Sequence, residues 1–250
     1  MRGGSKLKIG RVNRELASKT YALAALLTAT LVVTLSVHGA SCDHHDEWRN
    51  LADFSQISVT APVTVVLHQS DSQAQEGYCL EGDGAESINV SLQVSDGVMY
   101  IDGVSTSQAN DVVVHLASRT ISDIYVNAAA RVVGHAIEVS RLVLEGHGAS
   151  EIDIQNVTVG DLVVAGFGGA QITTSGTATH QSVDIDGIGT YLAPGLATET
   201  SQVSVRGAGR VELWVEELLD VDILGAASVI YTGSPWVTQQ ITGHGALHKL

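Results

Sequence analysis

The stretch that decides the fold is LVLEGHGASEIDI at 142–154, with further copies at 162–174, 183–195, 203–215 and 221–233 and a partial copy at 241–250. Each copy has apolar residues at alternate positions, then Gly-x-Gly or Gly-x-Ala, then more alternation. The first glycines of successive copies are 20, 21, 20, 18 and 18 residues apart. Because side chains on a strand point to opposite faces in turn, this pattern predicts strands with an apolar inner and a polar outer side.

The length of the repeat limits the architecture. A strand–helix–strand unit needs about 30 residues, and a propeller blade needs about 40. A coil of about 20 residues, with two or three short strands and tight corners, fits the spacing. The sequence therefore predicts an all-β protein, a single-stranded parallel β-helix in which like residues stack on like. The recurring glycines are expected at the corners, where positive backbone angles and close approach are needed.

Aligning the copies on their first glycines predicts the stacked ladders of the core. The ladder before the glycines is Leu142, Leu162, Val183, Val203 and Val221, and the one after them is Ser150, Ala170, Tyr191, Val211 and Val229. Polar residues between the ladders are expected to face solvent.

The region before these copies is less regular. The segment YCLEGDGAESINV at 78–90 matches the copy at 142–154, and alternation also runs from Ile57 to Leu67. Residues 54–120 are expected to form either the first coils or a less regular cap with some antiparallel pairing.

The N-terminus has the composition of an export signal. Six of the 13 basic residues precede residue 20, and residues 21–37 carry no charge. This pattern predicts a helix that is either a cleaved signal peptide or an uncleaved membrane anchor. The predicted organisation is a signal or anchor at 1–42, a polar linker at 43–53 and a β-helix domain at 54–250.

Cys42 has three alternative fates. The sequence Gly-Ala-Ser-Cys at 39–42 resembles a lipoprotein processing site, which would make Cys42 the lipidated first residue of an envelope lipoprotein. Ordinary cleavage near Gly39 or Ala40 would leave the thiol free. A disulfide with Cys79 is the third alternative, because export leads to an oxidising compartment.

Charge limits the range of partners. The part after residue 42 holds seven basic and 26 acidic residues, a formal net charge of −19. Such a surface repels nucleic acid and anionic headgroups. Membrane association is therefore expected only through the N-terminus.

The candidates for chemistry are few. Asp184 and Asp186 could form an acidic face for a carbohydrate-active enzyme, with Asp153 and Asp222 on neighbouring coils. The repeat alignment places no lysine or arginine near them, which favours a solvated polar face. His44 and His45 favour a hydrophilic linker over a weak metal site. We expect no catalytic, cofactor-binding or metal-binding residue.

The chain resembles a known family of exported bacterial proteins, the putative auto-transporter adhesin head (GIN) domains. The resemblance rests on FSQISV at 54–59, the Gly-Ala-Ser and Gly-Ala-Gly corners at 148–150 and 207–209, and GAASVIYTGSP at 225–235 followed by Gly-His-Gly at 243–245. It implies a right-handed β-helix, exported or lipid-anchored, and it supplies no site residues. The expected function is a non-enzymatic envelope protein for adhesion, binding or assembly, with a protein or glycan at the cell surface as partner. End-to-end association of copies is also expected, because the ends of a β-helix expose unpaired strands.

Overall fold

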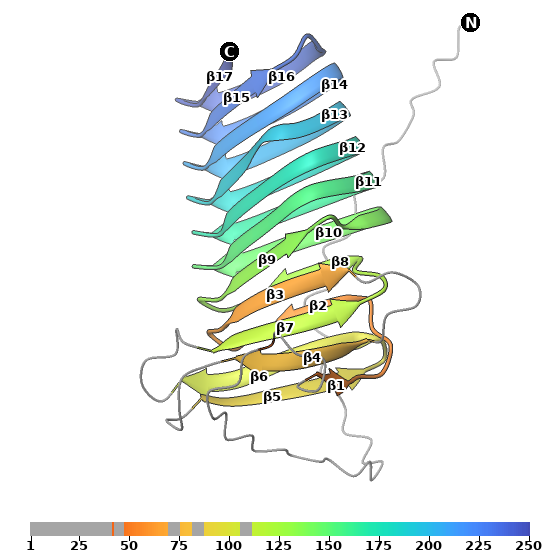
Figure 1. The fold of residues 1–250 in the computed structure, drawn as a ribbon. Helices are drawn as coiled ribbons and strands as arrows, with labels where there is room; N and C mark the ends of the chain where they lie inside the picture. Colours follow the sequence, from red (N-terminus) through yellow and green to blue (C-terminus); the bar gives the residue numbers. More distant parts are fainter. Residues whose placement is uncertain (1–41, 43–47, 70–75, 82–87, 106–111) are drawn as a thin grey trace, which may run out of the picture. The chain divides into compact units, whose positions relative to one another are not determined.

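The computed structural model describes residues 42, 48–69, 76–81, 88–105 and 112–250 as strands, turns and loops (Figure 1). These residues belong to one compact unit, 33–250. None of the described segments forms a helix with the length and hydropathy of a membrane span. The signal or anchor helix expected within 1–42 lies outside the described residues, apart from Cys42 itself.

All strands of the described residues belong to one 17-stranded sheet. Its strands are β1 (Arg49–Asn50), β2 (Gln56–Val59), β3 (Thr64–Gln69), β4 (Gly77–Glu81), β5 (Ile88–Ser95), β6 (Val98–Ser105), β7 (Val113–Ser118), β8 (Asp123–Val126), β9 (Arg131–His135), β10 (Glu138–Gly148), β11 (Glu151–Gly168), β12 (Gln171–Gly187), β13 (Thr190–Gly207), β14 (Arg210–Gly225), β15 (Ser228–Thr232), β16 (Trp236–Gly243) and β17 (Ala246–Lys249).

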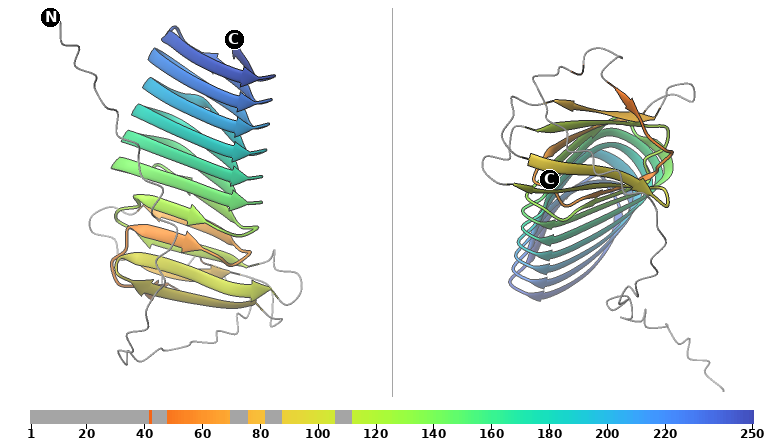
Figure 2. Two further views of the ribbon diagram at one scale, coloured as in Figure 1. Left: turned by 180° about the vertical axis from the view of Figure 1, so that it is seen from behind. Right: turned by 90° about the horizontal axis from the view of Figure 1, so that it is seen from below.

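The strands from β8 onward wind into stacked parallel coils, as predicted (Figure 2). Each long strand continues from the second half of one coil into the first half of the next. In β11, for example, Glu151–Gln155 pairs with β9, and residues 158–168 pair with β10. Every inner coil thus bonds its backbone to the coils above and below, which satisfies the polar groups of the main chain.

The predicted inside and outside faces are confirmed, and one long apolar ladder shows this. Its stacked members are Ile124, Leu144, Val164, Val183, Val203 and Val221. All of them are buried. The core of the unit is one continuous cluster of such ladders, almost entirely Val, Ile, Leu and Ala.

The predicted register is wrong by two residues at one step. Val183 stacks on Val164 and not on Leu162, and Gly187 stacks on Gly168 and not on Gly166. The ladder after the corner likewise brings Tyr191 onto Ile172. Aligning the copies on their first glycines caused the error. In the structure, the second glycines of two early copies, Gly148 and Gly168, stack in one column with the first glycine of the next copy, Gly187. A shift of two leaves every side chain on its face, so alternation alone could not detect the error.

The paired glycines take the corners because no side chain fits there. Gly207 has φ +120°, and a β-carbon on it would lie 2.3 Å from the carbonyl oxygen of Gly187 in the coil below. Gly187, Gly225 and Gly243 also have positive φ. The predicted structural role of this glycine column is confirmed.

The N-terminal part combines the two arrangements expected for residues 54–120. Strands β2 and β3 form a regular coil, which lies between the β6–β7 coil and the β8–β9 coil. The coils therefore do not follow the order of the chain. Below them, β5 pairs antiparallel with β6, β4 pairs antiparallel with β7, and β1 pairs antiparallel with β4. These antiparallel strands cover the first coil of the stack.

Candidate functional site

The described surface is hollowed by a pocket of about 390 Å³ that crosses five strands, β10 to β14. One edge is a column of stacked residues, Arg141, Asp161, His180, Thr200 and Leu218. The remaining lining residues are Leu162, Val163, Gln181, Ser182, Ser201, Gln202 and Asp220.

Irregular pairing precedes the pocket in three of its strands. The register shifts between Ile154 and Val157 in β11, between Thr173 and Ser175 in β12, and between Ala193 and Ala197 in β13. Such bulges bend a strand and re-aim its side chains. The bend comes just before the lining residues, so a binding surface can form there on an otherwise regular stack.

The lining is about half polar and half apolar, and its charges are mixed. It combines one arginine, two aspartates and a histidine with hydroxyl and amide side chains. His180 Nδ1 lies 2.9 Å from Thr200 Oγ1 of the next coil. Donors and acceptors repeated from coil to coil can bind an extended ligand with hydroxyl or amide groups. No motif in the sequence marks this pocket.

Behind the pocket lies a polar network inside the core. Tyr191 is fully buried, and its hydroxyl lies 2.7 Å from Thr174 Oγ1 and accepts a hydrogen bond from Gln181 Nε2 at 2.6 Å. Ser201 Oγ donates to Gln181 Oε1 at 3.0 Å and lies 3.0 Å from Thr198 Oγ1. Burial raises the pKa of Tyr191, so the phenol stays neutral.

The sequence contained a signal for this network. Gln181 and Ser201 occupy a ladder whose other members include Leu142, Leu162 and Leu219. Two polar residues at inward positions require partners, because unpaired polar groups are costly in a core. Only the correct register places Gln181 and Ser201 in a ladder of leucines, and aligning the copies on their first glycines does not give that register.

The carboxylates of Asp184 and Asp186 form ion pairs with an arginine side chain. Arg206 of the next coil donates from Nη2 to Asp184 at 2.8 Å and from Nε to Asp186 Oδ2 at 3.3 Å. The expectation that no basic residue lies near these aspartates is therefore wrong. The expectation overlooked that Arg206 stands at the position of Asp186 in the next copy, where the two residues stack, and its side chain also reaches Asp184. All three side chains are more than 40% exposed.

The other two aspartates do not join this group. Asp222 lies two coils above Asp184 in the same column, with Ser204 between them. Asp153 lies in a different ladder, between Val133 and Thr173. The expectation of neighbouring coils is wrong for both. Arg206, Asp184 and Asp186 thus form an exposed ion-pair cluster outside the pocket lining.

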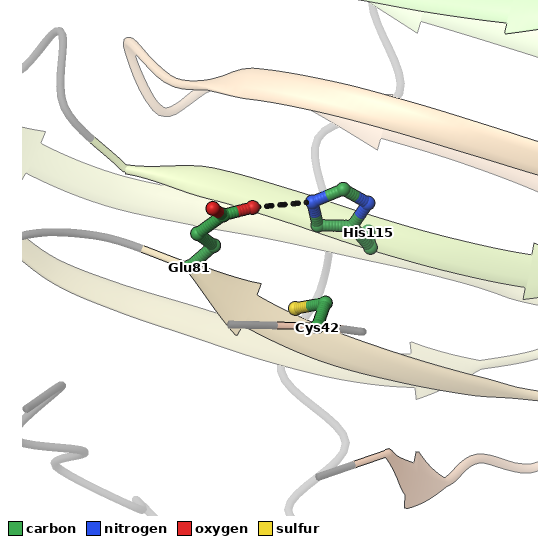
Figure 3. A group of neighbouring side chains, drawn as sticks. All are labelled: Cys42, Glu81 and His115. Carbon is green, nitrogen blue, oxygen red and sulfur yellow. Dashed lines mark hydrogen bonds and ion pairs between the residues drawn. The ribbon is translucent and has the colours of Figure 1, made fainter. Parts of the chain in front are cut away.

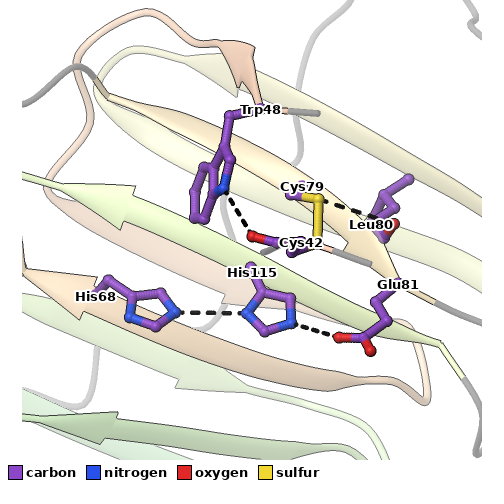
Figure 4. The surroundings of a disulfide bond; sticks show 7 residues. All are labelled: Cys42, Trp48, His68, Cys79, Leu80, Glu81 and His115. Atoms are coloured by element: carbon purple, nitrogen blue, oxygen red, sulfur yellow. Dashed lines mark hydrogen bonds and ion pairs between the residues drawn. A yellow bond between two sulfur atoms is a disulfide. The ribbon is translucent and has the colours of Figure 1, made fainter. Parts of the chain in front are cut away.

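A second polar cluster surrounds a disulfide at the N-terminal cap. Cys42 and Cys79 are joined, with their Cα atoms 5.9 Å apart (Figure 4). Of the three fates considered for Cys42, the structure has the disulfide. This bond occupies the sulfur that a lipid thioether would need.

The side chains of Cys42, Glu81 and His115 have ligand-type atoms within 4.8 Å of one another (Figure 3). The sulfur of Cys42 is already bonded, so it does not serve as a metal ligand in this state. His115 Nε2 lies 3.1 Å from Glu81 Oε2, and His115 Nδ1 lies 3.4 Å from His68 Nε2. Burial, and next the charge of His115, lower the pKa of His68. His44 and His45 lie outside the described residues.

Comparison with known proteins identifies the repeat region. A family model described as "Putative auto-transporter adhesin, head GIN domain" matches residues 53–235. No curated protein matches the chain.

Solved structures share the fold at low identity. A putative adhesin from Bacteroides fragilis is 19% identical, with a TM-score of 0.72 over 81% of this chain and 95% of its own. A putative adhesin from Parabacteroides distasonis is 19% identical, with a TM-score of 0.62 over 81% and 95%. A protein named as a putative lipid binding protein, also from Parabacteroides distasonis, is 14% identical, with a TM-score of 0.59 over 81% and 95%.

Proposed function

The chain belongs to the family of putative auto-transporter adhesin head GIN domains, and from this membership we propose that it is an exported, non-enzymatic binding protein. Its stack of coils presents a preformed surface to a partner at the cell surface. The observation that carries the proposal is the pocket across β10 to β14, where polar and apolar side chains from successive coils share the lining.

The ligand that suits this pocket is an extended, largely uncharged glycan. Hydroxyl and amide groups of Ser182, Thr200 and Gln202 can exchange hydrogen bonds with sugar hydroxyls. The exposed side chain of Leu218 beside them can contact the apolar face of a ring. Gln181 and Ser201 line the pocket and are held by the buried hydrogen-bond network. Few side chains therefore have to lose conformational freedom when a ligand binds.

Export is supported by two features. The basic leader with its uncharged stretch at 21–37 has the composition of a signal. The disulfide between Cys42 and Cys79 is of a kind that persists in oxidising compartments such as the periplasm and cell surface. We propose a location in the cell envelope, with attachment through the N-terminal segment.

The mode of attachment can be tested by intact mass and detergent partitioning. The full chain is produced with its leader in a bacterium, beside a Cys42→Ser variant. An unmodified mass that falls by 2 Da on disulfide formation is expected. A diacyl or triacyl mass beginning at Cys42, absent in the variant, would show lipidation instead and would exclude the disulfide.

The binding function can be tested by adherence. A non-adherent bacterium expressing the full chain is applied to immobilised polysaccharides and to immobilised proteins. We expect adherence to a polysaccharide, lost in Gln202→Trp, which fills the pocket, and retained in Asp186→Asn, which lies outside it. Adherence to proteins alone, or adherence that Gln202→Trp leaves unchanged, would contradict the proposal.

The same assay separates binding from catalysis. A carbohydrate-active enzyme working through Asp184 and Asp186 would release reducing ends or unsaturated sugars from the polysaccharide. We expect no release above that of a strain lacking the protein. Release that disappears in Asp184→Asn would establish the enzymatic alternative.

A further inference from the structure

Two imidazole rings each point a nitrogen at the other beside the disulfide, on adjacent parallel strands (Figure 4). His68 on β3 and His115 on β7 lie with ring planes 13° apart and centroids 5.7 Å apart. Nε2 of His68 is 3.4 Å from Nδ1 of His115. At this distance the two nitrogens make at best a weak hydrogen bond to each other.

The other nitrogen of His115 is held by a carboxylate. Glu81, at the end of β4, places Oε2 3.1 Å from His115 Nε2. A carboxylate acceptor at this distance keeps the proton on Nε2, so that Nδ1 presents its lone pair toward His68. Metal-binding histidines commonly have their second nitrogen held by a carboxylate in this way.

The surroundings hold the rings without covering them. The indole of Trp48 meets both rings edge-on, with centroids 6.1 Å from His68 and 6.5 Å from His115. Trp48 in turn donates from Nε1 to the carbonyl oxygen of Cys42 at 3.4 Å. Because Cys42 is joined to Cys79 on β4, the disulfide ties this support to the sheet. His68 remains exposed, so an ion can enter from solvent.

We propose that His68 Nε2 and His115 Nδ1 bind one divalent transition metal ion, with zinc as the probe and water completing the coordination. A tetrahedral zinc ion with Zn–N bonds of about 2.0–2.1 Å holds two nitrogens about 3.4 Å apart. The observed separation of the two nitrogens is 3.4 Å. Glu81 acts through His115 and not as a ligand. The site lies at the N-terminal cap, on strands other than those that line the pocket, and is independent of the proposed binding function.

The experiment is calorimetric titration of Zn²⁺ into the full chain with its disulfide intact. One zinc ion per chain is expected, with binding abolished in His115→Gln and in His68→Gln. Glu81→Gln should weaken binding about tenfold, because it removes the partner that orients His115. Thermal melts of the same samples show whether each variant is folded.

Two control variants distinguish this site from histidines elsewhere. His248→Ala removes an exposed histidine of β17, and His44→Ala/His45→Ala removes the pair between Cys42 and Trp48 in sequence. Both should bind zinc like the unmodified chain. Absence of zinc binding by the unmodified chain, full binding by folded His115→Gln, or loss of binding in His44→Ala/His45→Ala would each overturn the proposal.

Discussion

Substitution of Tyr191 by phenylalanine tests the buried network behind the pocket. The change keeps the ring and removes a hydroxyl that lies 2.7 Å from Thr174 Oγ1 and 2.6 Å from Gln181 Nε2. A buried polar group left without a partner costs about 1–3 kcal/mol. The change leaves the buried Gln181 amide nitrogen without its acceptor and the buried Thr174 hydroxyl without its partner. We expect Tyr191→Phe to lower the free energy of unfolding by about 2–3 kcal/mol.

The double variant Tyr191→Phe/Gln181→Leu provides the decisive comparison. Leucine returns Gln181 to the residue type of its ladder neighbour Leu162, so both partners of the broken bond become apolar. Replacing both members of a buried pair is far less costly than removing one. The double variant should therefore be more stable than the sum of the two single variants, with a coupling on the order of 1–2 kcal/mol.

The pH dependence provides a second, independent readout. Burial raises the pKa of Tyr191 in the folded chain, whereas an unfolded tyrosine titrates near pH 10. Above about pH 10 the unfolded state loses this proton and the folded state keeps it. The free energy of unfolding should therefore fall as pH rises, by about 1.4 kcal/mol per pH unit from this group. Tyr191→Phe should lack that contribution.

The assay is guanidinium unfolding of the full chain and its variants, followed by circular dichroism at pH 8 and between pH 10 and 11. Additive effects of Tyr191→Phe and Gln181→Leu would refute the network. An unchanged slope with pH in Tyr191→Phe would refute the burial of its hydroxyl.

Other substitutions test the coils, the corner and the cap. Val205→Asp places an unpaired charge in the core and should lower the free energy of unfolding by about 3 kcal/mol or more. Asp186→Asn alters one exposed ion pair and should lower it by no more than about 1 kcal/mol. Thermal melts that rank the two variants the other way would contradict the assignment of faces. Gly207→Ala should cost more than about 2 kcal/mol, because its φ is +120° and a β-carbon would lie 2.3 Å from a carbonyl oxygen. Gly97→Ala, with φ +77° and no atom within 4 Å of the new β-carbon, should cost about 1 kcal/mol in the same melts. Cys79→Ser opens a link between residues 37 apart in sequence and should cost about 3–4 kcal/mol of unfolding free energy; an equal midpoint in guanidinium would show that the bond does not stabilise the cap.

The candidate sites were predictable only in part. The stacking of Arg206 on Asp186 was available from the repeat alignment, but the second ion pair of Arg206, with Asp184, depends on how far the arginine side chain reaches. The pocket depends on bulges that no repeat pattern encodes. His68 and His115 are 47 positions apart in sequence. They meet because β3 and β7 pair, and the non-sequential order of the first coils brings those strands together.

The amino-acid sequence by itself determined the architecture and the inside of each coil. A repeat of about 20 residues with alternating apolar positions can bury its apolar side only by stacking on copies of itself, and alternation follows directly from strand geometry. Only the tertiary structure decided the register between coils, the place of the β2–β3 coil and the partners of buried polar groups. Alternation has a period of two residues, so a register shift of two residues leaves the alternating pattern unchanged. Pairing between strands that are distant in sequence depends on the whole stack.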